Sequence, residues 1–477
     1  MVVGELAHEK DIVIIGGGPG GYHAAIRAAQ LGKKVTLIEK NELGGVCLNE
    51  GCIPSKILTT AAARINLFKD SEEMGIGDAN PIFHYEKLRN YQRKVMDQLK
   101  NGVKALVQAN KVEMVHGNAY FLSDDRIGID SGDHFEVFKF NQAVIATGSI
   151  PEEINGIIPN GDKIFNSKMI LDMTEIPGHL LIYGHNEMAL EMASSFHTFG
   201  SEVTILLDKE DFGFDPSIEK EVKRILKKKK IKLIKNVQLT GVQRLNDVIQ
   251  VEITTLDEKV SVSGTHLLLA TNTVPNTKQL GLEKIGVILD KHGFIVTDKQ
   301  CQSSLATIYA VGDVTEGPAL AVKAIKQGKV AAESIAGKLA EFDPFFLPKI
   351  VHFQPQIATV GISEEYAIEQ GLKVNIAQFP LASNGYATLL GKKEGFIKVI
   401  SDAENETILG IHMMGEGAIE LISSGILSLE MVAREEDLTF PLYPHPSINE
   451  GLLEAVESLK DMAVHIPPKK IQNKVTI

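Results

Sequence analysis

The chain has 477 residues, with 49 Lys and Arg against 61 Asp and Glu, which gives a formal net charge of −12 with His neutral. This acidic balance argues against nucleic acid as a partner. At about 150 residues per domain, the length suggests roughly three domains. The 44% hydrophobic content and the 42 glycines are typical of a packed α/β enzyme with many tight turns.

Cysteine content and hydropathy set further limits. Three cysteines are too few for the disulfide framework of a secreted domain, and the N-terminal stretch MVVGELAHEK lacks the apolar segment of a signal peptide. No apolar run approaches the roughly 20 residues that a membrane span requires. We therefore expect a cytoplasmic protein without a membrane partner.

The pattern of strands and helices repeats along the chain. Apolar, Ala-rich and β-branched stretches predict a strand at 11–15, a helix at 22–31 and a strand at 34–39, and later a strand at 180–183, a helix through Phe199 and a strand at 203–207. The offset is constant, because Gly16 maps to Gly184 and Gly32 to Gly200, 168 residues later in each case. Two βαβ units are therefore expected.

The remaining elements indicate how the chain is divided. Apolar strands end in small-residue turns at 143–148 and 267–271, and a strand at 308–311 leads into an Ala-rich helix at 320–335. A Pro- and Phe-rich linker at 342–348 precedes alternating strands and two helical stretches. We expect a first nucleotide-binding domain (1–148), a second (149–276), a return to the first (277–345) and a separate C-terminal domain (346–477).

The first glycine motif directly follows a strand and precedes a helix. Gly16, Gly18 and Gly21 form G-x-G-x-x-G, and Glu39 ends the next strand. The first glycine permits a tight turn, the second lets the backbone approach a pyrophosphate, and the third packs helix on strand. Glu39 can accept a hydrogen bond from a ribose hydroxyl.

The second copy departs from this pattern at two points. It reads Gly184, Asn186 and Ala189 at the glycine positions, and Leu207 occupies the place of Glu39. A side chain at 186 crowds the point at which a pyrophosphate approaches the backbone. Asp208 lies one residue after the position that corresponds to Glu39, so its side chain points to the other face of the sheet if the strand continues. A purely structural Rossmann domain remains an alternative for this unit.

Two thiols lie five residues apart at a predicted helix start. Cys52 precedes Pro54, which suits the first turn of a helix, and a helix N-terminus stabilises a thiolate. No further Cys or His lies nearby at ligand spacing, so a metal site is not expected. Cys47 and Cys52 are therefore predicted to be a redox-active dithiol, with Glu50 opposing thiolate formation unless it points away. Cys301 is expected to be a buried hydrophobe.

A histidine near the C-terminus has the setting of an acid–base group. His445 lies between two prolines, and Glu450 follows five residues later. Ser447 and Glu450 also fit an ordinary helix start, and that interpretation would prevail without the dithiol. With a dithiol present, a His whose second nitrogen is held by a carboxylate is suited to deprotonate a thiol.

Taken together, these motifs resemble the pyridine nucleotide-disulfide oxidoreductases over essentially the whole chain, and most closely the lipoamide branch of that family. The resemblance is carried by the first glycine motif, Gly44 to Lys56, Ala146-Thr147-Gly148, Ile308 to Asp313, and His445-Pro446-Ser447 through Glu450. It implies an α/β fold with two Rossmann-like three-layer domains, one for FAD and one for NAD, and a C-terminal α+β dimerisation domain.

The resemblance also implies the residues that contact each cofactor. For FAD they are Gly16, Gly18, Gly21, Glu39, Lys40, Gly45, Lys56, Gly117, Thr147, Gly148, Asp313, Leu320 and Ala321. For NAD they are Gly184, Asn186, Glu191 and Asn272. Lys56 and Glu191 match a family pair that tunes the nicotinamide face of the flavin.

The implied activity is the oxidation of protein-bound dihydrolipoamide, with electrons passing through the Cys47/Cys52 disulfide and FAD to NAD. Cys47 would exchange with substrate, Cys52 would lie against the flavin, and His445, oriented by Glu450, would come from the partner subunit of a homodimer. The expected partner is a lipoyl domain or the acyltransferase core of a 2-oxo-acid dehydrogenase complex.

Departures from the family pattern are concentrated at the nicotinamide nucleotide. Asn186, Leu207 and the Asn272-Thr273 turn all fall there, and Val322 replaces a usual His elsewhere. This clustering suggests weakened, altered or lost use of NAD. Two alternatives therefore stay open: an FAD-dependent reductase of another disulfide with a non-standard electron donor, and an inactive structural subunit of a 2-oxo-acid dehydrogenase complex.

Overall fold

The computed structural model describes residues 7–76, 82–154, 156–255 and 258–467, so most of the N-terminal stretch discussed above lies outside the described residues. The chain forms two compact units. One comprises Met1–Leu58, His84–Glu175 and Thr271–Asp343, and the other Thr59–Phe83, Ile176–Ala270 and Pro344–Ile477. The division into four segments remains a prediction. Within the described residues, no helix combines the length and apolar character needed to cross a membrane.

The first unit is built on a seven-stranded sheet in the order β3-β2-β1-β6-β5-β4, with β17 paired to β6 outside this path. The strands are β1 (His8–Ile15), β2 (Val35–Glu39), β3 (Glu113–His116), β4 (Asn118–Ser123), β5 (Arg126–Asp130), β6 (Phe135–Ile145) and β17 (Ile308–Ala310). β1 pairs in parallel with both β2 and β6. Ile12, Val13 and Ile14 are fully buried, as expected for a parallel strand covered on both faces.

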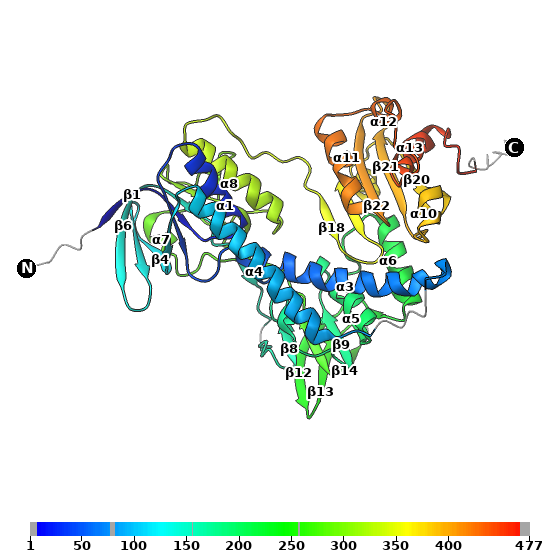
Figure 1. The fold of residues 1–477 in the computed structure, drawn as a ribbon, viewed down its shortest axis with the longest axis horizontal. Helices are drawn as coiled ribbons and strands as arrows, with labels where there is room; N and C mark the ends of the chain where they lie inside the picture. The colour runs from blue at the N-terminus through cyan, green and yellow to red at the C-terminus, as the bar shows by residue number, and fades with distance from the viewer. Residues whose placement is uncertain (1–6, 77–81, 155, 256–257, 468–477) are drawn as a thin grey trace, which may run out of the picture. The chain divides into compact units, whose positions relative to one another are not determined.

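Helices pack against this sheet. They are α1 (Pro19–Gln30), α2 (Gly45–Asn49), α4 (Tyr85–Ala109), α7 (Leu282–Ile285) and α8 (Ala321–Ile335), and α3 (Cys52–Ser71) begins in this unit. α1 and α8 lie side by side (Figure 1). Their close approach depends on Gly328, because an added Cβ would lie 2.3 Å from the Gly20 carbonyl oxygen. The short strands β7 (Ser149–Pro151) and β16 (Thr273–Pro275) pair with each other and complete the unit, whereas β8 (Ile164–Asn166) is the edge strand of the sheet β11-β10-β9-β15-β8.

The second unit contains the predicted second βαβ unit. β9 (His179–Tyr183), α5 (Glu187–Phe199) and β10 (Glu202–Leu206) follow one another, and β11 (Lys232–Ile234) and β15 (His266–Leu269) extend the parallel pairing. α6 (Pro216–Lys228) has Lys227 and Lys228 in its last turn, where the helix dipole favours basic residues. β12 (Gln238–Leu245), β13 (Val248–Thr254) and β14 (Lys259–Gly264) form a separate antiparallel sheet.

The C-terminal part of this unit is a five-stranded antiparallel sheet in the order β18-β19-β22-β21-β20. Its strands are β18 (Lys349–Val351), β19 (Ile357–Gly361), β20 (Val374–Pro380), β21 (Phe396–Asp402) and β22 (Ile408–Met414). The prediction of two helical stretches was wrong, because the described residues contain α9 (Glu364–Glu369), α10 (Gly385–Leu389), α11 (Ala418–Glu430), α12 (Glu435–Thr439) and α13 (Glu450–Glu457). Three of them are too short to show helical periodicity.

The two faces of this sheet bury different kinds of side chain. α11 and α13 pack on one face, where Gly425 approaches Ile411 and Gly451 approaches Ile397. Successive strand residues point to opposite faces, so Lys398, which pairs with His412 across the sheet, points to the other face. A layered α+β domain results, with an apolar core on one side and buried polar groups on the other.

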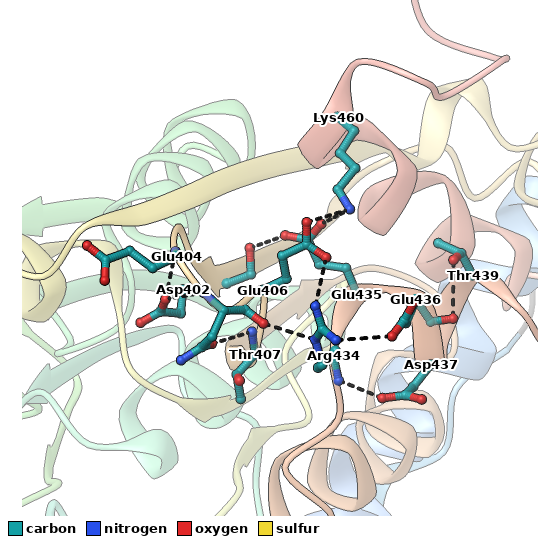
Figure 2. A network of polar contacts seen from close by, with 12 residues as sticks. Asp402, Glu404, Glu406, Thr407, Arg434, Glu435, Glu436, Asp437, Thr439 and Lys460 are labelled. Carbon is teal, nitrogen blue, oxygen red and sulfur yellow. Dashed lines mark hydrogen bonds and ion pairs between the residues drawn. The ribbon is translucent and has the colours of Figure 1, made fainter.

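A network of hydrogen bonds and ion pairs connects the turn between β21 and β22 to α12 and to the 3-10 turn Ser458–Lys460 (Figure 2). Glu435 accepts a hydrogen bond from Ser401 Oγ at 2.6 Å and pairs with Lys460 at 3.1 Å. Lys460 and Arg434 both pair with Glu406, at 2.9 and 3.6 Å. The shared partners give the turn a fixed position although most of these groups are partly exposed.

Candidate active site

The first glycine motif forms the turn that was predicted. Gly16 has φ +103°, and a Cβ there would lie 2.4 Å from the Ala146 carbonyl oxygen. A Cβ on Gly21 would lie 1.8 Å from the Gly16 carbonyl oxygen, which explains the glycine at the third position. Gly45 approaches Gly18, since its Cβ would lie 2.6 Å from Gly18 Cα. The motif is therefore tightly closed around the start of α1.

Glu39 lies at the end of β2 and faces this motif. One carboxylate oxygen accepts the Gly17 N–H at 2.6 Å and the other accepts the Asn41 N–H at 2.7 Å. The Glu39 carbonyl oxygen accepts the Gly117 N–H at 3.1 Å. Glu39 is thus held beside the loop, as an acceptor for a ribose hydroxyl must be. Lys40 is exposed just beyond it.

The start of α1 fits a pyrophosphate. Gly18 is its N-cap residue, no side chain caps the helix, and Pro19 begins it. Helix N-termini bind phosphate through their unsatisfied N–H groups and the positive end of the helix dipole. The geometry of residues 16–21 therefore suits FAD, which the family resemblance places here.

The two cysteines lie together, as predicted. Cys47 is inside α2 and Cys52 is the first residue of α3. Both are in the thiol form, and their side chains are hydrogen-bonded to each other. The hydrogen bond with Cys52 and burial raise the pKa of Cys47, while the positive charge of Lys56 opposes the shift. The Cys47 thiol is therefore harder to deprotonate than an ordinary cysteine.

Charges around the pair are arranged by neighbouring elements. Glu50 forms an ion pair with Lys168, which offsets its charge. Burial raises the pKa of Asp313, and the hydrogen bond that its carboxylate accepts from Ser149 Oγ at 2.9 Å opposes the increase. Asp313 also acts electrostatically on Cys47. The glycine motif, the dithiol and Asp313 thus belong to one compact unit.

Other predicted contacts of the first unit have identifiable positions. Thr147 donates to the Asn276 carbonyl oxygen at 2.8 Å, and Asn276 Nδ2 donates back to the Thr147 carbonyl oxygen at 3.2 Å. Gly148 has φ +70°. Leu320 is the N-cap residue of α8, which begins at Ala321. Sequence reasoning missed Ser149 and Asn276, because Asn276 lies 129 residues from Thr147 and no local signal marks the pair.

His445 and Glu450 are paired in the C-terminal domain. His445 Nδ1 lies 2.7 Å from Glu450 Oε1, and Glu450 Oε2 accepts the Ser447 N–H at 2.9 Å. Ser447 Oγ donates to the Pro444 carbonyl oxygen, so only half of the predicted capping pattern forms. The His445 side chain is 79% exposed. Its Nε2 edge is therefore available for proton transfer.

The second glycine motif differs from the first in its side chains. Gly184 repeats the tight turn, since a Cβ there would lie 2.0 Å from the Ala270 carbonyl oxygen. Asn186 is the N-cap residue of α5, and its Oδ1 accepts the Ala189 N–H at 3.1 Å. His185 Nδ1 lies 2.8 Å from Asp208 Oδ1. Leu207 is fully buried.

The remaining predicted residues lie as follows. Glu191 is buried in α5 and accepts the His352 N–H at 2.9 Å. Lys56 lies in the first unit and Glu191 in the second, so their pairing stays a prediction. Asn272 lies in the first unit, where its carbonyl oxygen accepts the Glu152 N–H. Cys301 is buried as predicted, and burial raises its pKa to about 12.

Comparison with known proteins agrees with this arrangement. Residues 10–328 match the Pyridine nucleotide-disulphide oxidoreductase family, and residues 347–456 match its dimerisation domain. A protein named dihydrolipoyl dehydrogenase from Geobacillus stearothermophilus is 38% identical, covering 98% of this chain and all of that protein. A protein of the same name from Bacillus subtilis (strain 168) is 39% identical, with the same coverage of both chains.

Solved structures share the fold. LpdA from Mycobacterium tuberculosis superposes with a TM-score of 0.89 at 23% identity, covering 94% of this chain and 99% of that one. The HOCl-induced flavoprotein disulfide reductase RclA from Escherichia coli gives a TM-score of 0.83 at 25% identity, with the same coverage. With its glycine motif, paired cysteines and dimerisation domain, the chain belongs to the pyridine nucleotide-disulphide oxidoreductase family.

Proposed function

We propose that this chain acts as a dihydrolipoyl dehydrogenase, oxidising a protein-bound dihydrolipoyl group through the Cys47–Cys52 pair and bound FAD. The observation that carries the proposal is the hydrogen-bonded thiol pair at the start of α3, within the same compact unit as a glycine motif whose helix has no side-chain cap. Relatives with this name, 37–39% identical over nearly the full chain, support the substrate class.

FAD would be held by groups of the first unit. The pyrophosphate would meet the start of α1 at Gly18, and Glu39 would accept from the adenosine ribose. Asp313, Lys56 and the first residues of α8 would lie toward the flavin end. When bound, FAD supplies the two-electron oxidant for the reduced cysteine pair.

The protein's own step is thiol–disulfide exchange. A dihydrolipoyl thiolate attacks the Cys47 sulfur of the Cys47–Cys52 disulfide, which forms a mixed disulfide and releases Cys52 as a thiolate. The second substrate thiolate then attacks the first substrate sulfur, which closes the lipoyl disulfide and releases Cys47. Two electrons and two protons leave the substrate. The raised pKa of Cys47 favours its protonation in the reduced pair.

His445 would accept the protons of the substrate thiols. Glu450 holds its Nδ1, which leaves Nε2 as the basic nitrogen. We expect it to act on the dithiol of the partner subunit, since the chain carries the dimerisation domain of its family. The macromolecular partner would be a lipoyl domain, or the acyltransferase core of a 2-oxo-acid dehydrogenase complex.

Anaerobic reduction of the FAD-loaded protein by dihydrolipoamide tests the proposal. We expect prompt loss of the oxidised-flavin absorbance in the parent protein and none in Cys47→Ser, which cannot form the mixed disulfide. Cys301→Ser is the matched control, because Cys301 is buried and distant in sequence from the pair. A parent protein whose flavin is not reduced by dihydrolipoamide would contradict the proposal and favour a different disulfide substrate or a structural role.

A further inference from the structure

The two βαβ units share one backbone framework, so their positions can be compared one by one. In each unit the first glycine donates its N–H to the second strand: Gly16 to Ile38 at 2.8 Å, and Gly184 to Leu206 at 3.1 Å. The carbonyl oxygen of the residue that follows this acceptor also accepts an N–H in both units: Glu39 from Gly117 at 3.1 Å, and Leu207 from Val237 at 3.0 Å. Differences between the units therefore lie in side chains.

The helix N-termini show the first difference. Gly18 has φ −70° and ψ −176°, and Asn186 has φ −78° and ψ 175°, so both have the same extended conformation that any residue adopts. Position 18 therefore requires glycine because glycine has no side chain, and not because the backbone there has an unusual φ. Asn186 Oδ1 already accepts the Ala189 N–H, one of the donors that a pyrophosphate would use.

The ribose end shows the second difference. In the first unit the Glu39 carboxylate accepts the Gly17 N–H. In the second unit Leu207 stands at that position, is fully buried and offers no acceptor side chain. His185, which corresponds to Gly17, binds Asp208 at 2.8 Å. The Asp208 carboxylate is therefore engaged, and its negative charge would also repel the 2′-phosphate of NADP.

We infer that the second unit has lost its pyridine-nucleotide site, so that NAD and NADP bind it weakly if at all. The Asn186 side chain accepts one of the N–H donors at the start of α5, a buried leucine replaces the ribose acceptor, and the Asp208 carboxylate is paired with His185. The inference concerns the electron acceptor within the proposed function, and it stands independently of the dithiol chemistry. The residues at this site do not fit the nucleotide that the family uses.

Calorimetric titration of the FAD-loaded protein with NAD⁺ and NADP⁺ measures the site directly, because neither reacts with an oxidised flavin. We expect no saturable binding in the parent. Asn186→Gly frees the Ala189 N–H for the phosphate. Adding Leu207→Glu to this variant supplies the missing ribose acceptor. Each change should tighten NAD⁺ binding about tenfold or more. The single variant covers the case in which a glutamate at the buried position 207 prevents folding.

A matched control removes the side-chain N-cap of a helix outside the glycine motifs. Ser363 caps α9 by accepting the Tyr366 N–H at 3.1 Å, so Ser363→Gly costs similar stability without opening a nucleotide site. The reverse substitution, Gly18→Asn, introduces into the first motif a side chain that can accept an N–H at the start of α1. We expect the purified variant to lose most of its FAD. Because position 18 has an extended conformation, asparagine introduces no backbone strain there.

Two results would overturn the inference. Parent protein that binds NAD⁺ as tightly as Asn186→Gly would show that the asparagine does not close the site. Gly18→Asn that retains FAD at the parental level would show that an N-cap side chain does not exclude a pyrophosphate in this fold. Neither result bears on the proposed function, which depends on flavin reduction by dihydrolipoamide and fails only if the parent protein is not reduced.

Discussion

Glu450 fixes the orientation of His445 with one oxygen and anchors itself with the other. Slight burial raises the pKa of Glu450, but the hydrogen bonds from His445 and from the Ser447 N–H outweigh it and lower that pKa overall. A carboxylate with a lowered pKa stays charged as the pH falls through the ordinary range for Glu. The pair therefore keeps its geometry across the range in which a histidine titrates.

Substitution of this pair should slow the exchange step. We expect His445→Gln to lower the rate of anaerobic flavin reduction by dihydrolipoamide about 10²- to 10⁴-fold, the usual contribution of a positioned base. Glu450→Gln should have a smaller effect and change the pH profile of that rate. Ser447→Ala is the control, because its N–H and not its Oγ holds Glu450. Stopped-flow absorbance measures all three, and an unchanged rate in His445→Gln would exclude its role.

Residues with local signals were predictable. The turn at Gly16, the helix start at Cys52 and the pairing of His445 with Glu450 all join groups a few residues apart, and the structure contains each of them. The hydrogen bond of His185 with Asp208 was not predicted, because it depends on where a strand ends. Asn186 was predicted to crowd the site, but its role as the cap of its own helix was not predicted.

At the scale of elements, a buried ion pair joins β21 to the start of α6. Lys398 is 1% exposed and donates to both carboxylate oxygens of Asp215, at 2.8 and 3.0 Å, and it also pairs with Glu364. Asp215 caps α6 by accepting the Ser217 N–H at 2.9 Å. Residues 183 apart in sequence thus meet, and no local pattern could have indicated it.

Breaking this pair from one side should be costly. Lys398→Met leaves Asp215 as an uncompensated buried charge, which we expect to destabilise the unit by about 3–5 kcal/mol. The double variant Lys398→Met/Asp215→Leu should recover most of that loss, since no buried charge remains. Lys232→Met is the contrasting control, because Lys232 and its partner Glu202 are 66% and 53% exposed and such an ion pair is worth about 1 kcal/mol or less. Urea unfolding, monitored by far-UV circular dichroism, measures the free energy of unfolding of each variant. Equal losses of this free energy in the single and double variants would contradict the expectation.

His412 gives the same sheet face a pH response. Burial lowers its pKa, although the charge of Asp215 and the hydrogen bond with the Ile362 carbonyl oxygen oppose the shift. Because the folded-state pKa lies below the unfolded value, the unfolded chain takes up the proton first, and stability falls as the pH drops below about 6.5. We expect His412→Gln to flatten this slope by at most roughly 1.4 kcal/mol per pH unit. Urea midpoints between pH 7.5 and 5.5 measure it, and an unchanged slope would assign the response to other groups.

Elements of ordinary length were predictable, and short ones were not. The helices at α1, α5 and α8 have enough residues to show Ala-rich or amphipathic periodicity. α9, α10 and α12 have six, five and five residues, which is too few for a helical repeat, so packing and capping decide their conformation. The strand order of the sheets depends on long-range pairing and was not predicted either.

At the scale of the whole molecule, several large apolar side chains that precede His445 in the chain are exposed. Phe440 is 90% exposed and Leu442 is fully exposed, and Met431 at the end of α11 is 77% exposed. Large exposed apolar side chains are typical of protein–protein contacts, and residues 347–456 match the dimerisation domain of the family. We expect Phe440→Asp with Leu442→Asp to shift the protein toward monomers in analytical ultracentrifugation, with a loss of dihydrolipoamide oxidation in parallel.

Whether His445 serves the dithiol of its own subunit or that of its partner can be decided by complementation. As homodimers, we expect Cys47→Ser to be inactive and His445→Gln to be at least about 10²-fold slower than the parent. If the site is shared between subunits, a mixed dimer combines the intact Cys47 of one chain with the intact His445 of the other and has one complete site of two. Half of the dimers in an equal, randomly exchanged mixture are mixed, so about a quarter of the parental rate should return.

If each subunit works alone, every chain in the mixture lacks one of the two groups and no activity returns. Exchange is achieved by refolding the two variants together with FAD, and differential affinity tags isolate the mixed dimers so that their composition is known. A mixture of Cys47→Ser with Cys52→Ser is the control, because neither arrangement then yields a complete dithiol. Recovery in the first mixture alone places the base and the dithiol on different subunits, which makes the dimer the smallest active form.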